Sequence, residues 1–253
     1  MNTHPHAEFR FYEELNDFLP REKRKLTFDY PLLRRASVKD IIEALGVPHT
    51  EVEVILANGE SVDFGYIVGG GDRISVYPMF ESLDIRPLLK LRELPLRQPR
   101  FVLDCHLGRL ARYLRQLGFD TLYRNDYSDE GLATISAGEK RILLTRDRNL
   151  LKRRIIDHGY FVRNQDPRRQ LDEVLARFDL YSDIEPFGRC TRCNGEVAAV
   201  DKTEILDRLE AGTRQNFDEF WQCSSCGQIY WEGSHFEKMK SLTDTLDPSK
   251  RGG

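Results

Sequence analysis

Three acidic residues in the middle of the sequence stand just beyond apolar segments that have the pattern of β-strands. They are Asp104, Asp129 and Asp147. If the strands are parallel, these carboxylates meet at one edge of the sheet, where they repel one another unless a cation lies between them. Oxygen ligands suit Mg²⁺ or Mn²⁺, and such an ion can activate water against a phosphodiester. Each acid alone could instead be an ordinary helix cap, so the predicted metal site depends on all three.

Four of the five cysteines form two pairs with the spacing of a metal site. Cys190 and Cys193 make one Cys-x-x-Cys motif, and Cys223 and Cys226 make another after 29 intervening residues. Two such pairs supply four thiolates, which bind Zn²⁺ tetrahedrally. Because four thiolates fill the coordination sphere, we expect a structural zinc ion and not a catalytic one. The alternative reading is two redox pairs or idle thiols.

Basic residues are concentrated in the central part of the chain. The net charge is −3, yet residues 86–178 contain 20 basic and 12 acidic side chains. Within this region Arg109, Arg112 and Arg115 follow one another at helical spacing. A basic stripe beside a carboxylate site suits a nucleic-acid backbone, although single arginines are commonly just solvated. We therefore predict that these three arginines bind a nucleic-acid backbone.

The elements that must position the acids alternate between strand and helix. Strands are predicted at 101–104, 120–123, 141–145 and 160–163, and helices at 107–117, 128–137, 149–156 and 166–178. This βαβαβαβα order predicts an α/β domain with a parallel sheet covered by helices on both faces. Ligands in such folds bind beyond the carboxyl ends of the strands, which is where the three acids are expected.

The first 85 residues have a different pattern. Alternating apolar residues predict strands near 7–11, 26–30, 52–57, 61–64 and 73–77. Ser37 and Asp40 form a capping box that begins a helix, and Gly46 ends it. The resulting order, ββαββ with a short insert, resembles the β-grasp, or ubiquitin-like, fold. Sulfur carriers of this fold end in Gly-Gly, but this segment continues without one, so a carrier role is not expected.

Several segments of the chain resemble the Mut-seven-C ribonuclease domain family, a branch of the PIN-like nucleases. They are Phe101–Asp104, Leu107–Arg115, Leu117–Asp120, Ser128–Glu130, Ile142–Asp147, Arg189–Asn194 and Cys223–His235. The resemblance covers essentially the whole chain. It implies three parts: a β-grasp ubiquitin-like domain at 1–85, a PIN-like ribonuclease domain at 100–180 and a Cys₄ zinc ribbon at 186–240.

The same resemblance implies roles for the acids. Asp104, Asp129 and Asp147 match the acidic positions of the nuclease and would hold Mg²⁺ or Mn²⁺. Glu130 competes with Asp129, because it is only one residue away. Asn149 stands where some PIN domains have a further acid, so the number of catalytic metals stays open.

The most direct interpretation is a metal-dependent ribonuclease. A non-catalytic zinc protein that binds RNA or the ribosome is the alternative. A phosphoryl-transfer enzyme is disfavoured, because its Asp-x-Asp motif is replaced here by Asp104-Cys105-His106. The sequence leaves several questions open: which RNA is cleaved, whether cleavage is endo- or exonucleolytic, what the β-grasp domain binds, what His235 does and what the oligomeric state is.

Composition supports a globular protein. Hydrophobic residues make up 40% of the chain and charged residues 31%. No apolar run is long enough to cross a membrane, and the N-terminus lacks the pattern of a signal peptide. Together with the paired cysteines, this predicts a cytoplasmic protein without a membrane partner.

Overall fold

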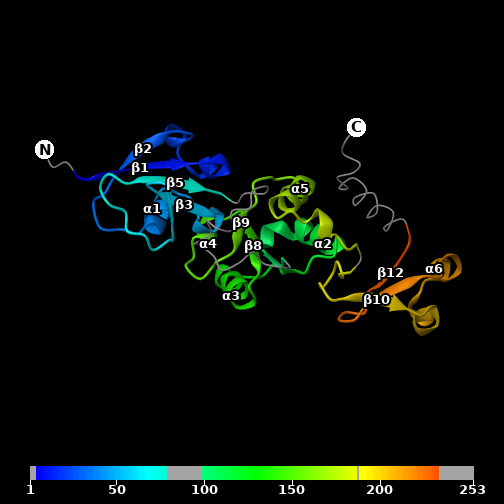
Figure 1. The fold of residues 1–253 in the computed structure, drawn as a ribbon. Helices are drawn as coiled ribbons and strands as arrows, with labels where there is room; N and C mark the ends of the chain where they lie inside the picture. Colours follow the sequence, from blue (N-terminus) through cyan, green and yellow to red (C-terminus); the bar gives the residue numbers. More distant parts are fainter. Residues whose placement is uncertain (1–3, 79–98, 187, 234–253) are drawn as a thin grey trace, which may run out of the picture. The chain divides into compact units, whose positions relative to one another are not determined.

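The computed structural model describes residues 4–78, 99–186 and 188–233 (Figure 1). The chain folds as two compact units. Unit 1 contains residues 1–98 and 129–161, and unit 2 contains residues 99–128 and 162–253. His235 lies outside the described residues. Among the described residues, no helix is both long and apolar enough to cross a membrane.

A five-stranded sheet and one helix make up the first part of unit 1 (Figure 1). The elements are β1 (His6–Phe11), β2 (Thr27–Pro31), α1 (Val38–Ala44), β3 (Val54–Ala57), β4 (Glu60–Val62) and β5 (Arg73–Tyr77), with short 3-10 helices at Glu13–Phe18, Arg21–Lys23 and His49–Glu51. The strand order is β2-β1-β5-β3-β4, in which β1 and β5 are parallel and the other pairs antiparallel. This arrangement confirms the predicted β-grasp fold.

Helix α1 begins at the predicted capping box. The Ser37 side chain accepts a hydrogen bond from Asp40 N at 3.1 Å, and the Asp40 side chain accepts one from Ser37 N at 3.3 Å. Gly46 follows the helix with a φ of +102°, a conformation that glycine adopts without strain. The helix buries Val38, Ile41 and Ile42 in the core of the sheet.

The second part of unit 1 contains α3 (Asp129–Glu139), β8 (Ile142–Thr145), α4 (Arg148–Leu151) and β9 (Gly159–Phe161). Strands β8 and β9 pair in parallel, with Leu144 opposite Tyr160, as predicted. The predicted helix at 149–156 is wrong, because helical structure ends at Leu151. Beyond it the chain forms turns, and the Ile156 carbonyl oxygen faces His49 Nε2 at 2.9 Å instead of continuing a helix. A tertiary contact therefore overrides the local helical pattern.

The helical segments of the β-grasp domain pack against residues 148–161 within this unit. The Glu51 side chain is 1% exposed, and its Oε1 accepts a hydrogen bond from Phe161 N at 2.6 Å. Lys152 Nζ donates to the Glu43 carbonyl oxygen at 3.0 Å. The rings of Phe18 and Phe161 meet edge to face at 5.5 Å between their centroids. These contacts join the two parts of unit 1 through buried polar and aromatic groups.

Unit 2 begins with a strand–helix–strand segment. Its elements are β6 (Phe101–Leu103), a 3-10 helix at Cys105–Leu107, α2 (Gly108–Gln116), β7 (Thr121–Tyr123), α5 (Pro167–Arg177) and a 3-10 helix at Tyr181–Asp183. Strands β6 and β7 are parallel, with Val102 opposite Leu122. Helix α5 begins as predicted: the Asp166 side chain accepts hydrogen bonds from Arg168 N and Arg169 N, and Pro167 is its first residue.

The C-terminal part of unit 2 is a small antiparallel sheet. It contains β10 (Val197–Val200), a 3-10 helix at Lys202–Arg208, α6 (Ala211–Asn216), β11 (Phe220–Cys223) and β12 (Ile229–Trp231), in the order β10-β11-β12. Between the two cysteine pairs, the 3-10 helix ends at Arg208 and α6 follows it. Its core is small and consists of Ile205, Leu209, Phe220 and Ile229.

Candidate functional site

Asp104 directly follows strand β6, as the sequence predicts. Its side chain is buried, with 7% of the residue exposed. The turn after it is fixed by Tyr123, whose hydroxyl donates to the Cys105 carbonyl oxygen at 2.9 Å. One ligand atom each from Asp104, Cys105 and His106 lies within 4.8 Å of the other two. A buried carboxylate thus stands beside two further groups that can ligate a metal.

Asp147 follows β8 with one residue between them. Its Oδ1 accepts a hydrogen bond from Asn149 N at 2.7 Å, and its own N–H donates to Thr145 Oγ1 at 3.0 Å. Asp147 is therefore the N-cap of α4. Capping occupies one oxygen of the carboxylate, so it does not exclude a metal ligand at the other.

Asp129 is the first residue of α3 and is exposed. Its Oδ2 lies 4.0 Å from an Arg153 guanidinium nitrogen, and both side chains are partly accessible to solvent. Glu130, the competing acid, is exposed beside it. Asp104 belongs to unit 2, whereas Asp129 and Asp147 belong to unit 1. Convergence of the three carboxylates therefore remains a prediction.

The three arginines of the predicted stripe differ in their exposure to solvent. Arg109 and Arg112 are exposed on α2, but Arg115 is only 5% exposed. Its guanidinium donates to the carbonyl oxygens of Thr121 at 2.8 Å, Thr191 at 3.3 Å and Arg192 at 3.2 Å. Arg115 is thus a structural residue, and the expectation that it binds nucleic acid is corrected, because its side chain is buried and its Nε and Nη1 groups donate to backbone oxygens.

Burial lowers the pKa of the Arg115 guanidinium, and the thiolates of Cys190 and Cys193, when deprotonated, oppose this change. Arg115 therefore links helix α2 to the first cysteine pair both by hydrogen bonds and by charge.

Asn194 makes a second link between these elements. Its Oδ1 accepts from Thr121 N at 2.8 Å, and its Nδ2 donates to Asp120 Oδ1 at 2.7 Å. The residue is 8% exposed and has a φ of +72°, a conformation that asparagine tolerates. The Cys-Asn dipeptide is the sequence signal that could have indicated this role.

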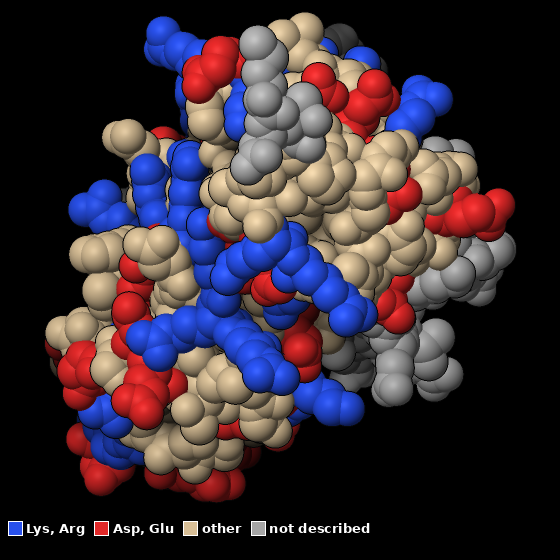
Figure 2. Space-filling model, turned by 90° about the vertical axis from the view of Figure 1, so that its left-hand side faces the viewer, with Lys and Arg blue, Asp and Glu red and all other residues tan. Residues whose placement is uncertain are grey.

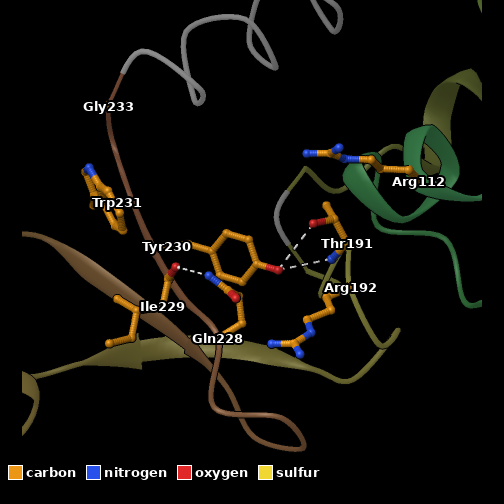
Figure 3. A pocket seen from close by; sticks show the side chains of 8 residues that line it. All are labelled: Arg112, Thr191, Arg192, Gln228, Ile229, Tyr230, Trp231 and Gly233. Carbon is orange, nitrogen blue, oxygen red and sulfur yellow. Dashed lines mark hydrogen bonds between the residues drawn. The ribbon is translucent and has the colours of Figure 1, made fainter. Parts of the chain in front are cut away.

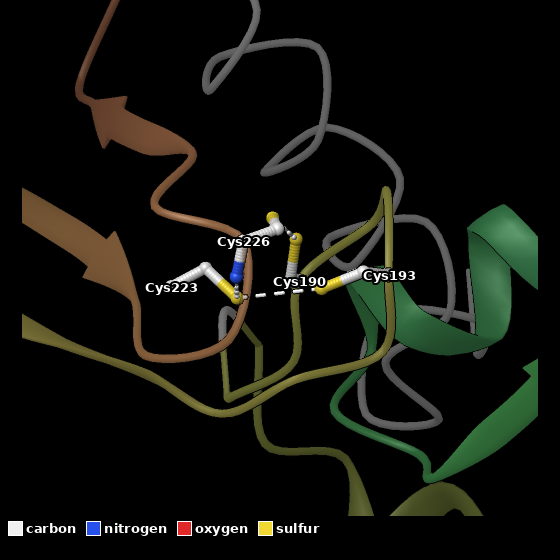
Figure 4. A group of neighbouring side chains, drawn as sticks. All are labelled: Cys190, Cys193, Cys223 and Cys226. Atoms are coloured by element: carbon white, nitrogen blue, oxygen red, sulfur yellow. Dashed lines mark hydrogen bonds between the residues drawn. The ribbon is translucent and has the colours of Figure 1, made fainter.

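The four cysteines predicted to bind zinc come together in unit 2. Their side chains point toward one another from two loops (Figure 4). Cys193 Sγ lies 3.4 Å from Cys223 Sγ, and Cys190 Sγ lies 3.6 Å from Cys226 Sγ. A zinc–sulfur distance of ~2.3 Å in a tetrahedron corresponds to sulfur–sulfur distances of about 3.8 Å. The cluster therefore fits one structural zinc ion.

The thiols of the first pair have unequal acidity in the metal-free protein. Burial alone would raise the pKa of Cys190, but hydrogen bonds from the Tyr230 hydroxyl and from backbone N–H groups lower it to about 7. Burial raises the pKa of Cys193 to about 12. Burial and the bond to Cys190 raise the pKa of Tyr230 to about 12, so its hydroxyl stays protonated and can donate to sulfur. Zinc binding must therefore displace protons.

Comparison with known families agrees with this architecture. The model of the Mut7-C RNAse domain matches residues 99–243, which is more than half of the chain. The chain belongs to the Mut7-C RNAse domain family. The Mut7-C ubiquitin model matches residues 4–84, the part that forms the β-grasp sheet. Both matches confirm the resemblance inferred from the sequence.

Two solved structures match a part of the chain. Two structures of small archaeal modifier protein 1 from Haloferax volcanii share 21% and 20% identity with the chain, with TM-scores of 0.25 and 0.24. Each covers 30% of this chain, and 99% and 96% of the modifier protein are aligned. No curated protein matches the chain.

Positive charge is exposed on the protein surface. Figure 2 shows one face, on which many Lys and Arg side chains lie next to one another among scattered Asp and Glu side chains. Within the Mut7-C domain, Arg109, Arg112, Arg153 and Arg154 are exposed. The basic excess of this region is therefore available to a polyanion.

Proposed function

We propose that this protein is a metal-dependent ribonuclease that hydrolyses RNA phosphodiester bonds. The observation that carries the proposal is the position of the acids in a Mut7-C RNAse domain: Asp104 and Asp147 come at or one residue beyond the carboxyl ends of parallel strands, and Asp129 opens the helix after a third strand. This is the edge at which ligands bind in parallel α/β sheets.

In this proposal Asp104, Asp129 and Asp147 hold Mg²⁺ or Mn²⁺ through carboxylate oxygens, which suit hard cations. When bound, such a cation activates water and stabilises the leaving oxygen. Asp147 is held in place by the hydrogen bond from Asn149 N to its carboxylate and by the bond from its own N–H to Thr145 Oγ1, at the end of β8. The burial of Asp104 limits access of bulk water to its carboxylate.

The exposed Arg109 and Arg112 would position the phosphate backbone of RNA. The zinc site has a separate, structural role, because four cysteine ligands leave no open coordination position for substrate. Paired cysteines at a metal site favour a reducing compartment, so we place the protein in the cytoplasm.

The test is cleavage of mixed RNA by purified full-length protein in Mn²⁺ or Mg²⁺. Asp147→Asn is the sharpest variant, because asparagine retains an oxygen that can cap α4 but loses the charge needed by the cation. We expect the cleavage rate to fall by a factor of about 10² or more, the scale of losing a strong transition-state stabiliser.

Asp157→Asn is the matched control, because Asp157 is an exposed carboxylate in the same unit and should be dispensable. Cleavage that persists unchanged in both Asp104→Asn and Asp147→Asn would refute the proposal. RNA binding without any cleavage by the parent protein would favour the alternative of a non-catalytic RNA-binding protein.

A further inference from the structure

A groove within unit 2 lies between helix α2 and the zinc ribbon. It has a volume of about 660 Å³, within the range of ~300–1,000 Å³ of small-molecule sites. Its lining consists of Arg112, Thr191, Arg192, Gln228, Ile229, Tyr230, Trp231 and Gly233 (Figure 3). A nucleotide is of a size that fits such a groove.

The charge of the lining is positive although the surrounding chain is acidic. Residues 179–253 contain 9 basic and 14 acidic side chains, yet the lining includes two arginines and no acid. Arg112 and Arg192 are exposed, and neither guanidinium forms an ion pair with the described residues. Because they come from α2 and from the first cysteine loop, a single anionic strand could contact both.

The aromatic part of the lining is held rigidly. The Tyr230 hydroxyl accepts a hydrogen bond from Thr191 N at 3.1 Å and lies 3.0 Å from Cys190 Sγ. In Figure 3 the Tyr230 ring lies between Trp231 on one side and Thr191 on the other. Contacts with the first cysteine loop therefore orient the Tyr230 ring in the groove.

The Trp231 indole packs closely against the backbone of Gly233. A Cβ atom at Gly233 would lie 2.8 Å from Trp231 Nε1, so only glycine leaves room for the indole in this position. Trp231 also packs against the small core of the ribbon and remains partly accessible. A rigid, partly exposed aromatic side chain beside unpaired arginines is typical of a site that stacks nucleobases.

We propose that this groove binds one strand of RNA, with bases stacked on Trp231 and Tyr230 and phosphates bound by Arg112 and Arg192. The Gln228 amide and the Thr191 hydroxyl supply polar groups that can contact base edges. The inference rests on the proposed function in taking RNA as the polyanion. It adds a strand-binding site on the zinc ribbon, separate from the carboxylates that would cleave the strand.

The experiment measures binding of a fluorescently labelled 12-nucleotide oligo(U) to the full-length protein without added Mg²⁺ or Mn²⁺. Arg192→Gln should weaken binding about fivefold or more and reduce the slope of log K against log salt by about 0.7, the value for one phosphate contact on a single strand. Lys202→Gln is the matched control, because Lys202 lies in the same ribbon and is already paired with Asp218 at 2.8 Å.

A second measurement reports stacking directly. The chain has two tryptophans, so Trp221→Phe leaves Trp231 as the only indole. Oligo(U) should quench its fluorescence along the same binding curve. Gly233→Ala should move the indole and weaken binding by about tenfold while the zinc content stays at one per chain.

The inference would be overturned if Arg192→Gln and the double variant Arg112→Gln/Arg192→Gln both bound oligo(U) with the affinity and salt slope of the parent protein. It would also be overturned if oligo(U) did not change the fluorescence of Trp231. Equal quenching by UMP and by oligo(U) at the same nucleotide concentration would refute the assignment to a strand. If groove variants lose binding while the parent protein cleaves no RNA, the nuclease proposal fails and the groove assignment stands. If the parent cleaves RNA and groove variants keep its KM and affinity, only the groove assignment fails.

Discussion

Arg112 and Arg115 lie on the same helix, three residues apart, and the structure predicts opposite consequences for replacing them. Arg115→Met keeps the length of the side chain but removes the donors to the Thr121, Thr191 and Arg192 carbonyl oxygens. Arg112→Met is the matched control, because Arg112 is exposed and makes no ion pair with the described residues.

The expected cost of Arg115→Met follows from its three contacts. A hydrogen bond to a charged group contributes ~1.5–3 kcal/mol, but two of the three distances are 3.2 and 3.3 Å, so we count them as weak. A total loss of about 3 kcal/mol in the free energy of unfolding results. For a protein of this size that corresponds to a fall of roughly 6–12 °C in Tm. Arg112→Met should change the free energy of unfolding by no more than ~0.5 kcal/mol.

The assay is thermal unfolding monitored by zinc release to a chromogenic chelator, so that the transition of the ribbon is observed and not that of unit 1. Salt-dependent RNA binding is measured on the same proteins. Arg115→Met should lower the Tm of the ribbon and leave the salt slope of RNA binding unchanged. Arg112→Met should leave the Tm unchanged and reduce the salt slope. If Arg115→Met unfolds like the parent and loses as much salt slope as Arg112→Met, then Arg115 binds phosphate and our reasoning is wrong.

Three further outcomes follow from buried groups. Cys223→Ser should abolish binding of the one zinc ion and expose the ribbon to proteolysis; parent protein that contains no zinc by elemental analysis would contradict the site. Because the pKa of Cys190 is about 7, zinc binding should release more protons per ion at pH 6 than at pH 8, as measured by calorimetry in two buffers; equal release would refute this. Glu51→Leu should cost ~1–3 kcal/mol by leaving Phe161 N–H without its acceptor, and unchanged hydrogen exchange at Phe161 would argue against that bond.

The sequence predicts secondary structure and the zinc site correctly where the local residue pattern agrees with the tertiary structure. Strand β1 alternates exposed and buried residues along its whole length, and the Ser37–Asp40 capping box begins α1 where expected. The two cysteine pairs likewise carry their own signal, because four thiols at that spacing favour a zinc site. In these cases the information lies in residues that are close in sequence.

The arginines show where such reasoning fails. Each helical residue turns by about 100°, so residues six apart, such as Arg109 and Arg115, differ by about 120° around the helix. Arg109 therefore faces solvent while Arg115 reaches the first cysteine loop, 76 residues further along the chain. Arginines at every third position of a helix are neighbours on its surface. Their spacing does not determine which side of the helix another segment of the chain will cover.

The contacts of the ubiquitin-like domain explain why domain boundaries in sequence and packing differ. In sequence, this domain ends before residue 85 and the Mut7-C RNAse match begins at residue 99. In packing, residues 129–161 belong with it, because Glu51 is buried against Phe161 and Lys152 binds the Glu43 carbonyl oxygen. A carboxylate that is 1% exposed is costly to bury without its hydrogen-bond donors. The β-grasp domain of this protein therefore packs against residues 148–161, the segment that follows Asp147 in the chain, and this packing cannot be read from the domain boundaries in the sequence.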